Sequence, residues 1–449
     1  MLKGMSNIYL PKLNEGLLRE DSSFRKNKLD YILVYLLVAT TGMNFFYQSV
    51  QFIVIGFLVT AFLFFARGLK IDRFLVGYLF LFFFIQMGQA FLFSFLSPLT
   101  FLGLYLRLLF AYFTIKLVDR KFTDYYINII YVFTLISFVF YIPSIIFPGF
   151  AQFFLQHITP HFVSPFANPN DFYYGEQQGH IIIFNFNAVI NAGRFYQIGR
   201  NSGPFWEPGA FGGFLMVAII FNLIKTKTLS NKKNVTFMIA ILTTFSTATY
   251  FVFIVFLGFN FLMNKRLRYK LVFLPVLLFI AVLSFNRFDF LRNKVLYSIQ
   301  LSQDVGQTYG ERTRFASAKL DLESLSKSPI FGLGRRIETR FAGIDDPYLR
   351  HRNNGLSYLL SVYGPVLFLF YFFLVFKSLK YLCTAHNFNL KFAYYALIII
   401  MLIGFSESYY LTPFFYALTL FHLVISPKVQ GSFSMNKNNY LNKCNYATG

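Results

Sequence analysis

Charged residues and cysteines are scarce in this sequence. Asp, Glu, Lys and Arg make up only 13% of its 449 residues, whereas about 25% is usual in soluble proteins. Its two cysteines cannot form a disulfide framework, and it has no glycine-rich nucleotide loop, no HExxH and no CxxC. These absences exclude a disulfide-stapled secreted domain, and the composition as a whole excludes a soluble cytosolic enzyme and a disordered chain.

Hydrophobic residues are abundant instead. They account for 56% of the chain, aromatic residues for 21% and Phe alone for 64 positions. The mean hydropathy is +0.52. Because a helix needs about 20 apolar residues to cross a bilayer, the chain has room for about a dozen crossings. We therefore predict an all-α polytopic integral membrane protein, with little chain left for a soluble domain.

Apolar runs place these crossings along the chain. They fall at 29–47, 48–66, 74–97, 99–118, 125–147, 208–224, 235–262, 270–286, 355–376, 392–406 and 409–426. The run 235–262 is long enough for two short helices, and small and hydroxyl residues at 243–249 favour a buried turn in its middle. Read as a hairpin, this run brings the prediction to about 12 transmembrane helices with both termini in the cytoplasm.

This topology divides the chain into seven segments. They are a cytoplasmic tail (1–28), transmembrane helices 1–5 (29–147), a first large outer loop (148–207), helices 6–9 (208–286), a second, Arg-rich outer loop (287–354), helices 10–12 (355–426) and a cytoplasmic tail (427–449). The second outer loop is expected to be partly helical.

Lys and Arg number 41, against 19 Asp and Glu. In a membrane protein such an excess first marks cytoplasmic loops, and 26 of the 41 fall there in the predicted topology. Two groups of cations do not fit this rule. The outer segment 287–354 holds 12 cations beside eight acids, and Arg107 lies inside an apolar span, where a charge usually faces a polar cavity or a partner. The basic balance therefore does not indicate a nucleic-acid partner.

The Arg-rich segment 287–354 has two interpretations. It is either a small charged cap or an outward-facing anion site, because the planar guanidinium fork matches phosphate. The stretch 311–327 predicts an amphipathic helix. The residues of its apolar stripe are Phe315, Ala318, Leu322 and Leu325. A turn with Gly332 and Gly334 follows, a spacing that can direct backbone N–H groups at an anion.

Two further segments border predicted spans. Trp206, the only Trp, and Glu207 directly precede the span that begins at Pro208. They form either an interfacial anchor with a helix start or, with Arg200, an anion contact and a base. His351 precedes another span, and its ordinary pKa suits proton transfer near neutral pH, although a lone histidine there can also be structural. The spacing of the other histidines fits no metal site, so none is predicted.

Two patches resemble the Wzy-type polysaccharide (O-antigen) polymerases and the O-antigen ligases. The first is the stretch 199–214, with its Arg–Asn–Ser–Gly–Pro–Phe–Trp–Glu–Pro segment. The second patch follows the shared signature in order, and its members here are Arg314, Pro329, Gly332, Gly334, His351, Leu356, Tyr363 and Gly364. Where that family often has a Trp four residues after the Arg, this chain has Ala318.

The resemblance implies a GT-C-type glycosyltransferase in the bacterial inner (cytoplasmic) membrane, with its active site facing the periplasm. It would transfer a growing glycan from undecaprenyl diphosphate to the next lipid-linked repeat unit, inverting the anomeric carbon without metal or cofactor. The implied partners are an undecaprenyl-diphosphate-linked oligosaccharide, membrane lipid and a chain-length regulator protein. Two alternatives stay open, namely an O-antigen ligase that transfers the glycan to lipid A–core and a transporter or flippase of lipid-linked sugars.

The reaction assigns roles to the candidate residues. Negative charge develops on the leaving diphosphate, and the attacking sugar hydroxyl must lose a proton. The predicted catalytic bases are His351 and Glu207. The predicted diphosphate-binding residues are Arg200, Arg312, Arg314, Arg335 and Arg336. The predicted substrate contacts are Arg352, Asn354 and Trp206.

Overall fold

The prediction of a mainly helical, membrane-embedded protein is confirmed. The computed structural model describes residues 28–47, 49–94, 98–165, 179–190, 199–263, 314–341 and 352–424. Within these ranges, four helices are long and apolar enough to cross a membrane: Arg73–Leu92, Pro98–Ile146, Pro208–Thr226 and Gly355–Ala385. The predicted span at 270–286 and most of both predicted tails lie outside the described ranges.

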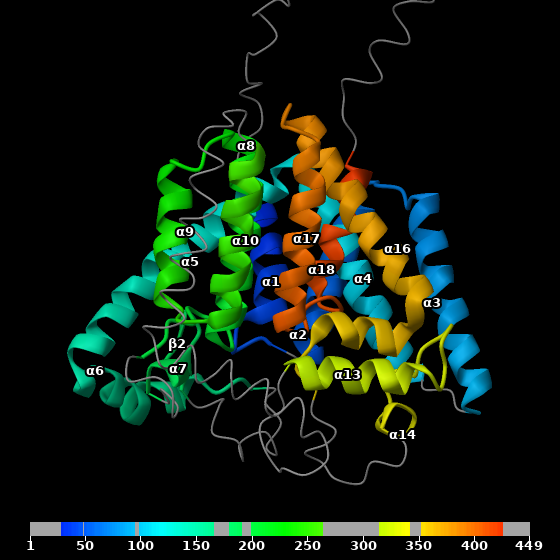
Figure 1. The fold of residues 1–449 in the computed structure, drawn as a ribbon, viewed down its shortest axis with the longest axis horizontal. Coiled ribbons are helices and arrows are strands. Elements are labelled where there is room, and N and C mark those ends of the chain that lie inside the picture. The colour runs from blue at the N-terminus through cyan, green and yellow to red at the C-terminus, as the bar shows by residue number, and fades with distance from the viewer. Residues whose placement is uncertain are drawn as a thin grey trace, which may run out of the picture.

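The N-terminal part of the chain forms five long helices (Figure 1). They are α1 (Lys28–Gly42), α2 (Val50–Ala66), α3 (Arg73–Leu92), α4 (Pro98–Val118) and α5 (Phe122–Ile146). A single 3₁₀ turn, η2 (Asp119–Lys121), joins the last two. Asp119 takes a left-handed backbone conformation (φ 56°), which separates α4 from α5.

Short elements follow α5. They are α6 (Pro148–Phe153), η3 (Phe154–Ile158), η4 (Thr159–Phe162), a hairpin of β1 (His180–Ile181) and β2 (Phe184–Asn185), and α7 (Asn187–Ile190). In the antiparallel hairpin His180 pairs with Asn185, and Ile181 pairs with Phe184. Phe184 and Phe186 pack with Tyr141 of α5 in a small aromatic cluster. The described part of the predicted first outer loop thus packs on α5 through a small core of its own.

The central helix is α8 (Pro208–Thr226), in which every residue from Pro208 to Ile224 is buried. It is followed by α9 (Lys232–Thr243) and α10 (Thr247–Met263). The run 235–262 is therefore two helices with a break at 244–246, as the predicted hairpin requires. The buried side chain of Thr244 donates a hydrogen bond to the carbonyl of Ile241 (2.7 Å), so the turn satisfies its polar groups internally.

The C-terminal part supplies the remaining helices. They are α13 (Arg314–Leu325), α14 (Ile337–Arg340), α16 (Gly355–Ala385), α17 (Lys391–Ser406), α18 (Pro413–Leu418) and η6 (Phe421–Leu423). α16 kinks at Gly364, whose φ is 74°, just before Pro365. The predicted span 409–426 is not one long helix. It contains two short helices instead, α18 and η6. The buried α18 is held at its start by a hydrogen bond from the Phe414 N–H to Thr41 of α1 (2.8 Å).

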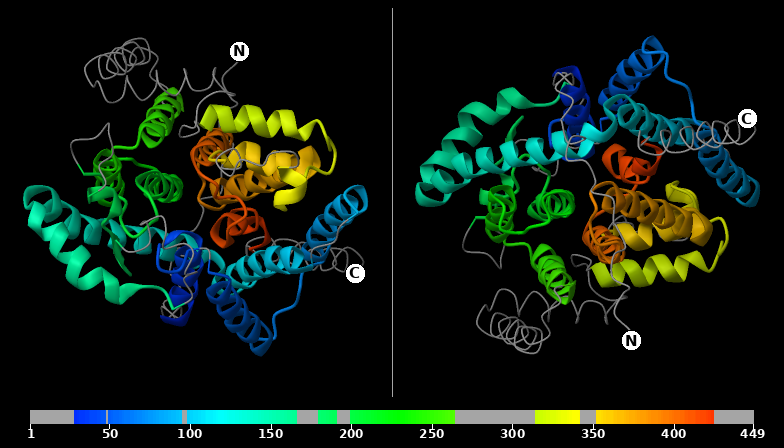
Figure 2. Two further views of the ribbon diagram at one scale, coloured as in Figure 1. Left: turned by 90° about the horizontal axis from the view of Figure 1, so that it is seen from below. Right: turned by 90° about the horizontal axis from the view of Figure 1, so that it is seen from above.

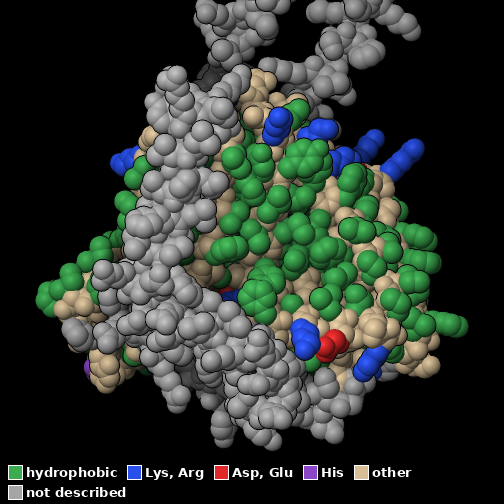
Figure 3. All heavy atoms as spheres, viewed as in Figure 1, with side chains coloured by type: hydrophobic (Ala, Val, Ile, Leu, Met, Phe, Trp, Pro, Cys, Tyr) green, Lys and Arg blue, Asp and Glu red, His purple; other side chains and the backbone are tan. Residues whose placement is uncertain are grey.

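The bundle has two polar ends with an apolar band between them (Figure 3). One end, here called the α13 end, carries α13, α14 and the starts of α8 and α16 (Figure 1). At the opposite end Lys116 pairs with Asp72 (3.2 Å) and Arg67 with Asp30 (3.0 Å). The concentration of Lys and Arg along this second rim in Figure 3 fits the cytoplasmic side of the predicted topology.

Two residues of the predicted apolar stripe of α13 face outward. Phe315 and Leu322 are 61% and 53% exposed, whereas Ala316, Ser317 and Asp321 are buried. In both end views α13 lies flat along the edge of the bundle (Figure 2). The outward side of α13 is mixed in character, because Lys319 and Glu323 are exposed beside Phe315 and Leu322.

Candidate functional site

Two glutamates and an arginine meet at the α13 end. Arg314, the first residue of α13, places its Nη2 atom 2.8 Å from Oε1 of Glu407 and 4.0 Å from Oε1 of Glu207. Its Nε atom also donates to the carbonyl of Ser406 (2.5 Å). Glu407 follows α17 and is 8% exposed. Three helices, α8, α13 and α17, thus converge on this site.

Two glycines let the backbone and side chain of Glu407 pack closely against α8 and α16. A Cβ atom on Gly209 of α8 would lie 2.9 Å from Oε1 of Glu407. A Cβ atom on Gly355, the first residue of α16, would overlap the backbone carbonyl of Glu407. Glu207 is the N-cap residue of α8, yet its side chain does not cap that helix. It shares a hydrogen bond with Glu407 instead.

The electrostatics favour a shared proton. Burial, and next the neighbouring Glu207, raises the pKa of Glu407, and the opposing effect of Arg314 is smaller. Burial lowers the pKa of Arg314, but the two carboxylates more than offset this, so Arg314 keeps its charge. Two carboxyl groups this close do not both ionise readily. The pair can therefore hold one proton near neutral pH and give or take it.

Arg200 and Trp206 flank this site. The Nε atom of Arg200 donates to the carbonyl of Thr244 (3.3 Å), which places Arg200 at the break between α9 and α10. A Cβ atom on Gly209 would lie 3.5 Å from the hydroxyl of Ser246 in the same break. Trp206 stacks on Tyr47, with ring centroids 4.4 Å apart and planes at 11°. The first motif thus adds a cation and an aromatic platform next to Glu207.

Asn354 connects the second motif to α13. Its Oδ1 atom caps α16 by accepting the N–H groups of Leu356 and Ser357, each at 3.0 Å. Its Nδ2 atom donates to the backbone carbonyl of Arg314 (3.2 Å). The start of α16 is therefore fixed relative to Arg314.

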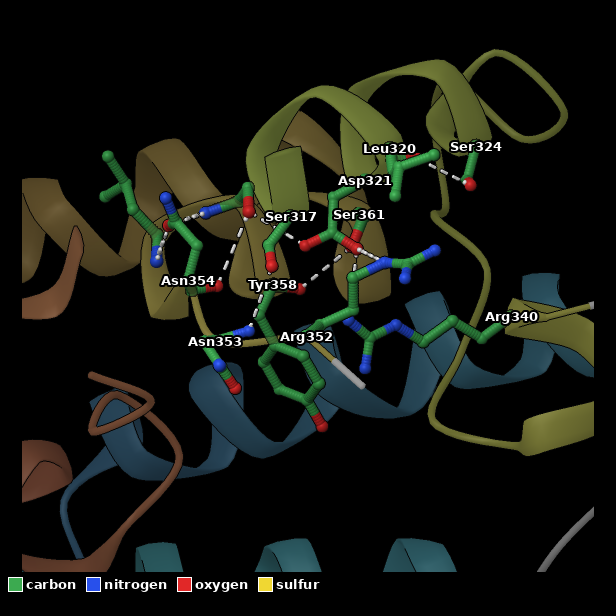
Figure 4. A network of polar contacts seen from close by, with 12 residues as sticks. Ser317, Leu320, Asp321, Ser324, Arg340, Arg352, Asn353, Asn354, Tyr358 and Ser361 are labelled. Atoms are coloured by element: carbon green, nitrogen blue, oxygen red, sulfur yellow. Dashed lines mark hydrogen bonds and ion pairs between the residues drawn. The ribbon is translucent and has the colours of Figure 1, made fainter. Parts of the chain in front are cut away.

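Arg352 belongs to a buried cluster around Asp321 (Figure 4). Its Nε atom lies 3.5 Å from Oδ1 of Asp321, and Nη2 of Arg340 lies 3.1 Å from the same oxygen. Ser357 of α16 donates to the other carboxylate oxygen (2.8 Å). The guanidinium of Arg340 also lies 4.3 Å from the ring centroid of Tyr358. This cluster docks the inner face of α13 onto α16.

The remaining predicted arginines lie apart from the glutamates. Arg336 pairs with the exposed Glu338 (3.3 Å). Arg335 interacts with Tyr358 of α16 and lies near Arg107 of α4. Arg312 and His351 lie outside the described residues, so their roles stay predictions.

Sequence reasoning missed Glu407. One signal was available, because Glu407 is the only acidic residue between 355 and 449 and falls between two apolar runs. A single acidic residue in a two-residue gap between the runs 392–406 and 409–426 has no motif around it that would distinguish it from a turn residue. In the described part of the chain, no three His, Cys, Asp or Glu residues gather as a metal site would require.

Comparison with known proteins adds no family assignment. No family model matches the chain, and no curated protein matches it. The fold and site define the class as a helical membrane protein with a carboxylate–arginine site at one polar end. Function must therefore be argued from this site.

Proposed function

We propose that the protein is a membrane glycosyltransferase that polymerises lipid-linked oligosaccharide units into a surface polysaccharide. One observation carries the proposal. The two patches that resemble Wzy-type polymerases are far apart in sequence, yet Arg314 of the second lies 4.0 Å from Glu207 of the first. Residues chosen only by motif thus gather at one polar end of a membrane bundle.

The site fits the chemistry of glycosyl transfer. The oxygen of a sugar hydroxyl on the incoming unit attacks the anomeric carbon of the growing chain, and the bond from that carbon to the lipid diphosphate breaks. The electron pair leaves with the diphosphate, which nearby arginines such as Arg200 stabilise. The hydroxyl proton passes to the Glu207–Glu407 pair or to His351. Arg314 orients the carboxylates and retains further N–H donors for a phosphate oxygen.

The experiment uses the purified protein in liposomes with a repeat unit linked to undecaprenyl diphosphate. We expect the wild-type protein to extend the glycan, with products resolved by length on a gel. Arg314→Gln should lower the rate at least about 100-fold, as expected for loss of a key electrostatic contact. Lys319→Gln is the matched control, because this exposed cation lies on the same helix.

Two results would count against the proposal. One is wild-type protein that makes no polymer from any supplied unit, and the other is Arg314→Gln with normal rates. Cells that lack the protein distinguish the polymerase, the ligase and the transporter. Loss of long glycan supports the polymerase, polymer retained on undecaprenyl diphosphate but absent from lipid A indicates the ligase, and units trapped in the cytoplasm indicate a transporter.

A further inference from the structure

The buried tyrosines of the bundle differ in whether their hydroxyl groups have hydrogen-bond partners. Tyr371 is 1% exposed, and its hydroxyl donates to the carbonyl of Phe415 (2.9 Å). Tyr363 and Tyr416 are 1% and 0% exposed. Neither of their hydroxyls has a hydrogen-bond partner within the described part of the chain. A hydroxyl that is buried without a partner costs free energy, so these two groups call for a partner that is not protein.

Both unpartnered hydroxyls belong to rings that pack edge-to-face on Phe82 of α3. The ring centroid of Phe82 lies 5.9 Å from that of Tyr363 and 6.2 Å from that of Tyr416. Tyr363 belongs to α16 and Tyr416 to α18, so three helices meet at this ring. The two hydroxyls therefore occupy one region of the core.

Gln86 of α3 adds an unpartnered acceptor to this region. It is 2% exposed, and its Oε1 atom has no hydrogen-bond partner in the described ranges. Gln86 lies one turn after Phe82 and one turn before Gln89, on the same face of α3. Gln89 donates to the carbonyl of Val362 (2.8 Å), which directly precedes Tyr363. Gln86 is thus flanked by two side chains that both contact this stretch of α16.

The backbone of α16 next to Tyr363 is held in place by protein groups. The helix kinks at Gly364, which interrupts its ladder of main-chain hydrogen bonds. The N–H groups of Leu333 and Gly334 donate to the carbonyls of Ser361 (2.8 Å) and Val362 (3.0 Å). The carbonyls before the kink therefore have protein partners, and the unpartnered polar groups of this region are side chains.

Arg107 of α4 lies near the same two tyrosines. It follows the first residue of α4 by nine residues, roughly 13 Å along the helix. Arg107 and both tyrosines interact electrostatically with one another. A charge inside an apolar span usually faces a polar cavity or a partner. A hydrated region beside the tyrosines would give Arg107 such surroundings.

We propose that Gln86, Tyr363 and Tyr416 bind ordered water inside the bundle. A buried water typically makes about three hydrogen bonds to polar groups that otherwise lack partners. Two phenol hydroxyls and one amide oxygen supply that number, and each comes from a different helix. Water bound there joins α3, α16 and α18 by hydrogen bonds and solvates Arg107. This inference goes beyond the proposed function and does not depend on it.

Radiolytic footprinting tests the water site in the wild-type protein in lipid nanodiscs. A short X-ray pulse converts water into hydroxyl radicals, which oxidise the side chains beside bound water even where these are buried. Mass spectrometry then gives the oxidation rate of each tyrosine. We expect the rates of Tyr363 and Tyr416 to be several-fold higher than those of the control residues Tyr371 and Tyr410.

The control residues match the candidates in type and burial. Tyr371 and Tyr410 are 1% and 2% exposed. Their hydroxyls donate to the carbonyls of Phe415 (2.9 Å) and Ile400 (3.1 Å), so they need no water. Oxidation of Tyr363 and Tyr416 as slow as that of the two controls would overturn the proposal.

Removal of single hydroxyls gives a second measurement. If the hydroxyl of Tyr416 had no partner at all, Tyr416→Phe would raise the Tm by removing a buried polar group. We expect no rise, because the substitution also takes a hydrogen-bond partner from the water. Tyr371→Phe is the matched control and should lower the Tm, since it leaves the Phe415 carbonyl unpartnered. A higher Tm in both Tyr363→Phe and Tyr416→Phe would show that the site is dry.

Gln86→Met tests whether the amide belongs to the same site. Methionine keeps the approximate shape of the side chain and removes the acceptor oxygen. We expect slower oxidation of Tyr363 and Tyr416, with the rate of Tyr371 unchanged. Unchanged oxidation of all three tyrosines would contradict a water site shared by Gln86 and the two hydroxyls.

Discussion

Glu407 is a buried acid whose environment suits proton transfer. Its carboxylate contacts Arg314 at 2.8 Å and shares a hydrogen bond with Glu207. The half-exposed Glu207 connects the buried acid to the surface. When one carboxyl group of a pair is buried and the other is accessible, their pKa values differ. Such a difference is typical of acid–base sites.

Glu407→Gln should make stability less sensitive to pH. Because the pKa of Glu407 is raised by burial and by Glu207, the folded protein keeps a proton that the unfolded chain releases near its ordinary pKa of about 4.3. The stability that this proton provides is present at low pH and is lost as pH rises through the raised pKa. The Tm of wild type should therefore fall more between about pH 5 and pH 8 than that of the variant.

The same substitution should lower the rate of glycan extension at least about 100-fold, as loss of a proton-transfer group does. Glu323→Gln is the control, since this exposed acid lies on α13 away from the pair. Parallel Tm curves for wild type and Glu407→Gln would contradict the raised pKa. Unchanged rates would remove Glu407 from the reaction.

At the scale of elements, α13 is a helix whose buried side carries Ser317 and Asp321. Asp321 on that face pairs with both Arg340 and Arg352, whose side chains are 9% and 2% exposed. Asn354 adds a bond from the start of α16 to the first residue of α13. Polar contacts, not apolar burial, therefore set the position of Arg314 relative to Glu407.

Asp321→Asn should destabilise the α13 end strongly. It removes the carboxylate charge that faces two buried arginines, and breaking a buried ion pair from one side typically costs about 3–5 kcal/mol. Hydrogen exchange should rise in α13 and at the start of α16 before the rest of the bundle opens. Asp321→Asn with wild-type exchange in α13 would show that the cluster does not hold the helix.

The exposed side of α13 should contact lipid. In Leu322→Trp, brominated phospholipids should quench the added fluorescence more than in Lys232→Trp, because Leu322 is 53% exposed beside Phe315 and Lys232 is an exposed cation at the opposite polar end. Trp206 contributes the same background to both proteins. Equal quenching at the two positions would place α13 in water instead.

At the scale of the whole molecule, the two polar ends differ in charge and in content. The carboxylate site and the Asp321 cluster both involve α13 at one end of the bundle, whereas Lys and Arg side chains gather along the opposite rim (Figure 3). This asymmetry predicts that substrates approach from one side of the membrane only.

Cysteine labelling in intact cells tests this sidedness. Lys327→Cys, after α13, should react with a membrane-impermeant maleimide from outside, and Lys232→Cys, at the start of α9, only after permeabilisation. Both positions are exposed, the native Cys383 is buried, and the variants are made in a Cys444→Ser background. Labelling of both in intact cells would refute the predicted topology.

The sequence by itself determined the class, because crossing a bilayer demands long apolar runs that composition and local order reveal. It also located the break at 244–246, Glu207 and Arg314, since hydroxyl-rich turns and clustered arginines are local patterns. Tertiary structure alone decided that Glu407 joins Glu207 and Arg314, and that Asp321 faces inward. These depend on ion pairs and glycine contacts between residues distant in sequence, which leave no periodic signal along the chain.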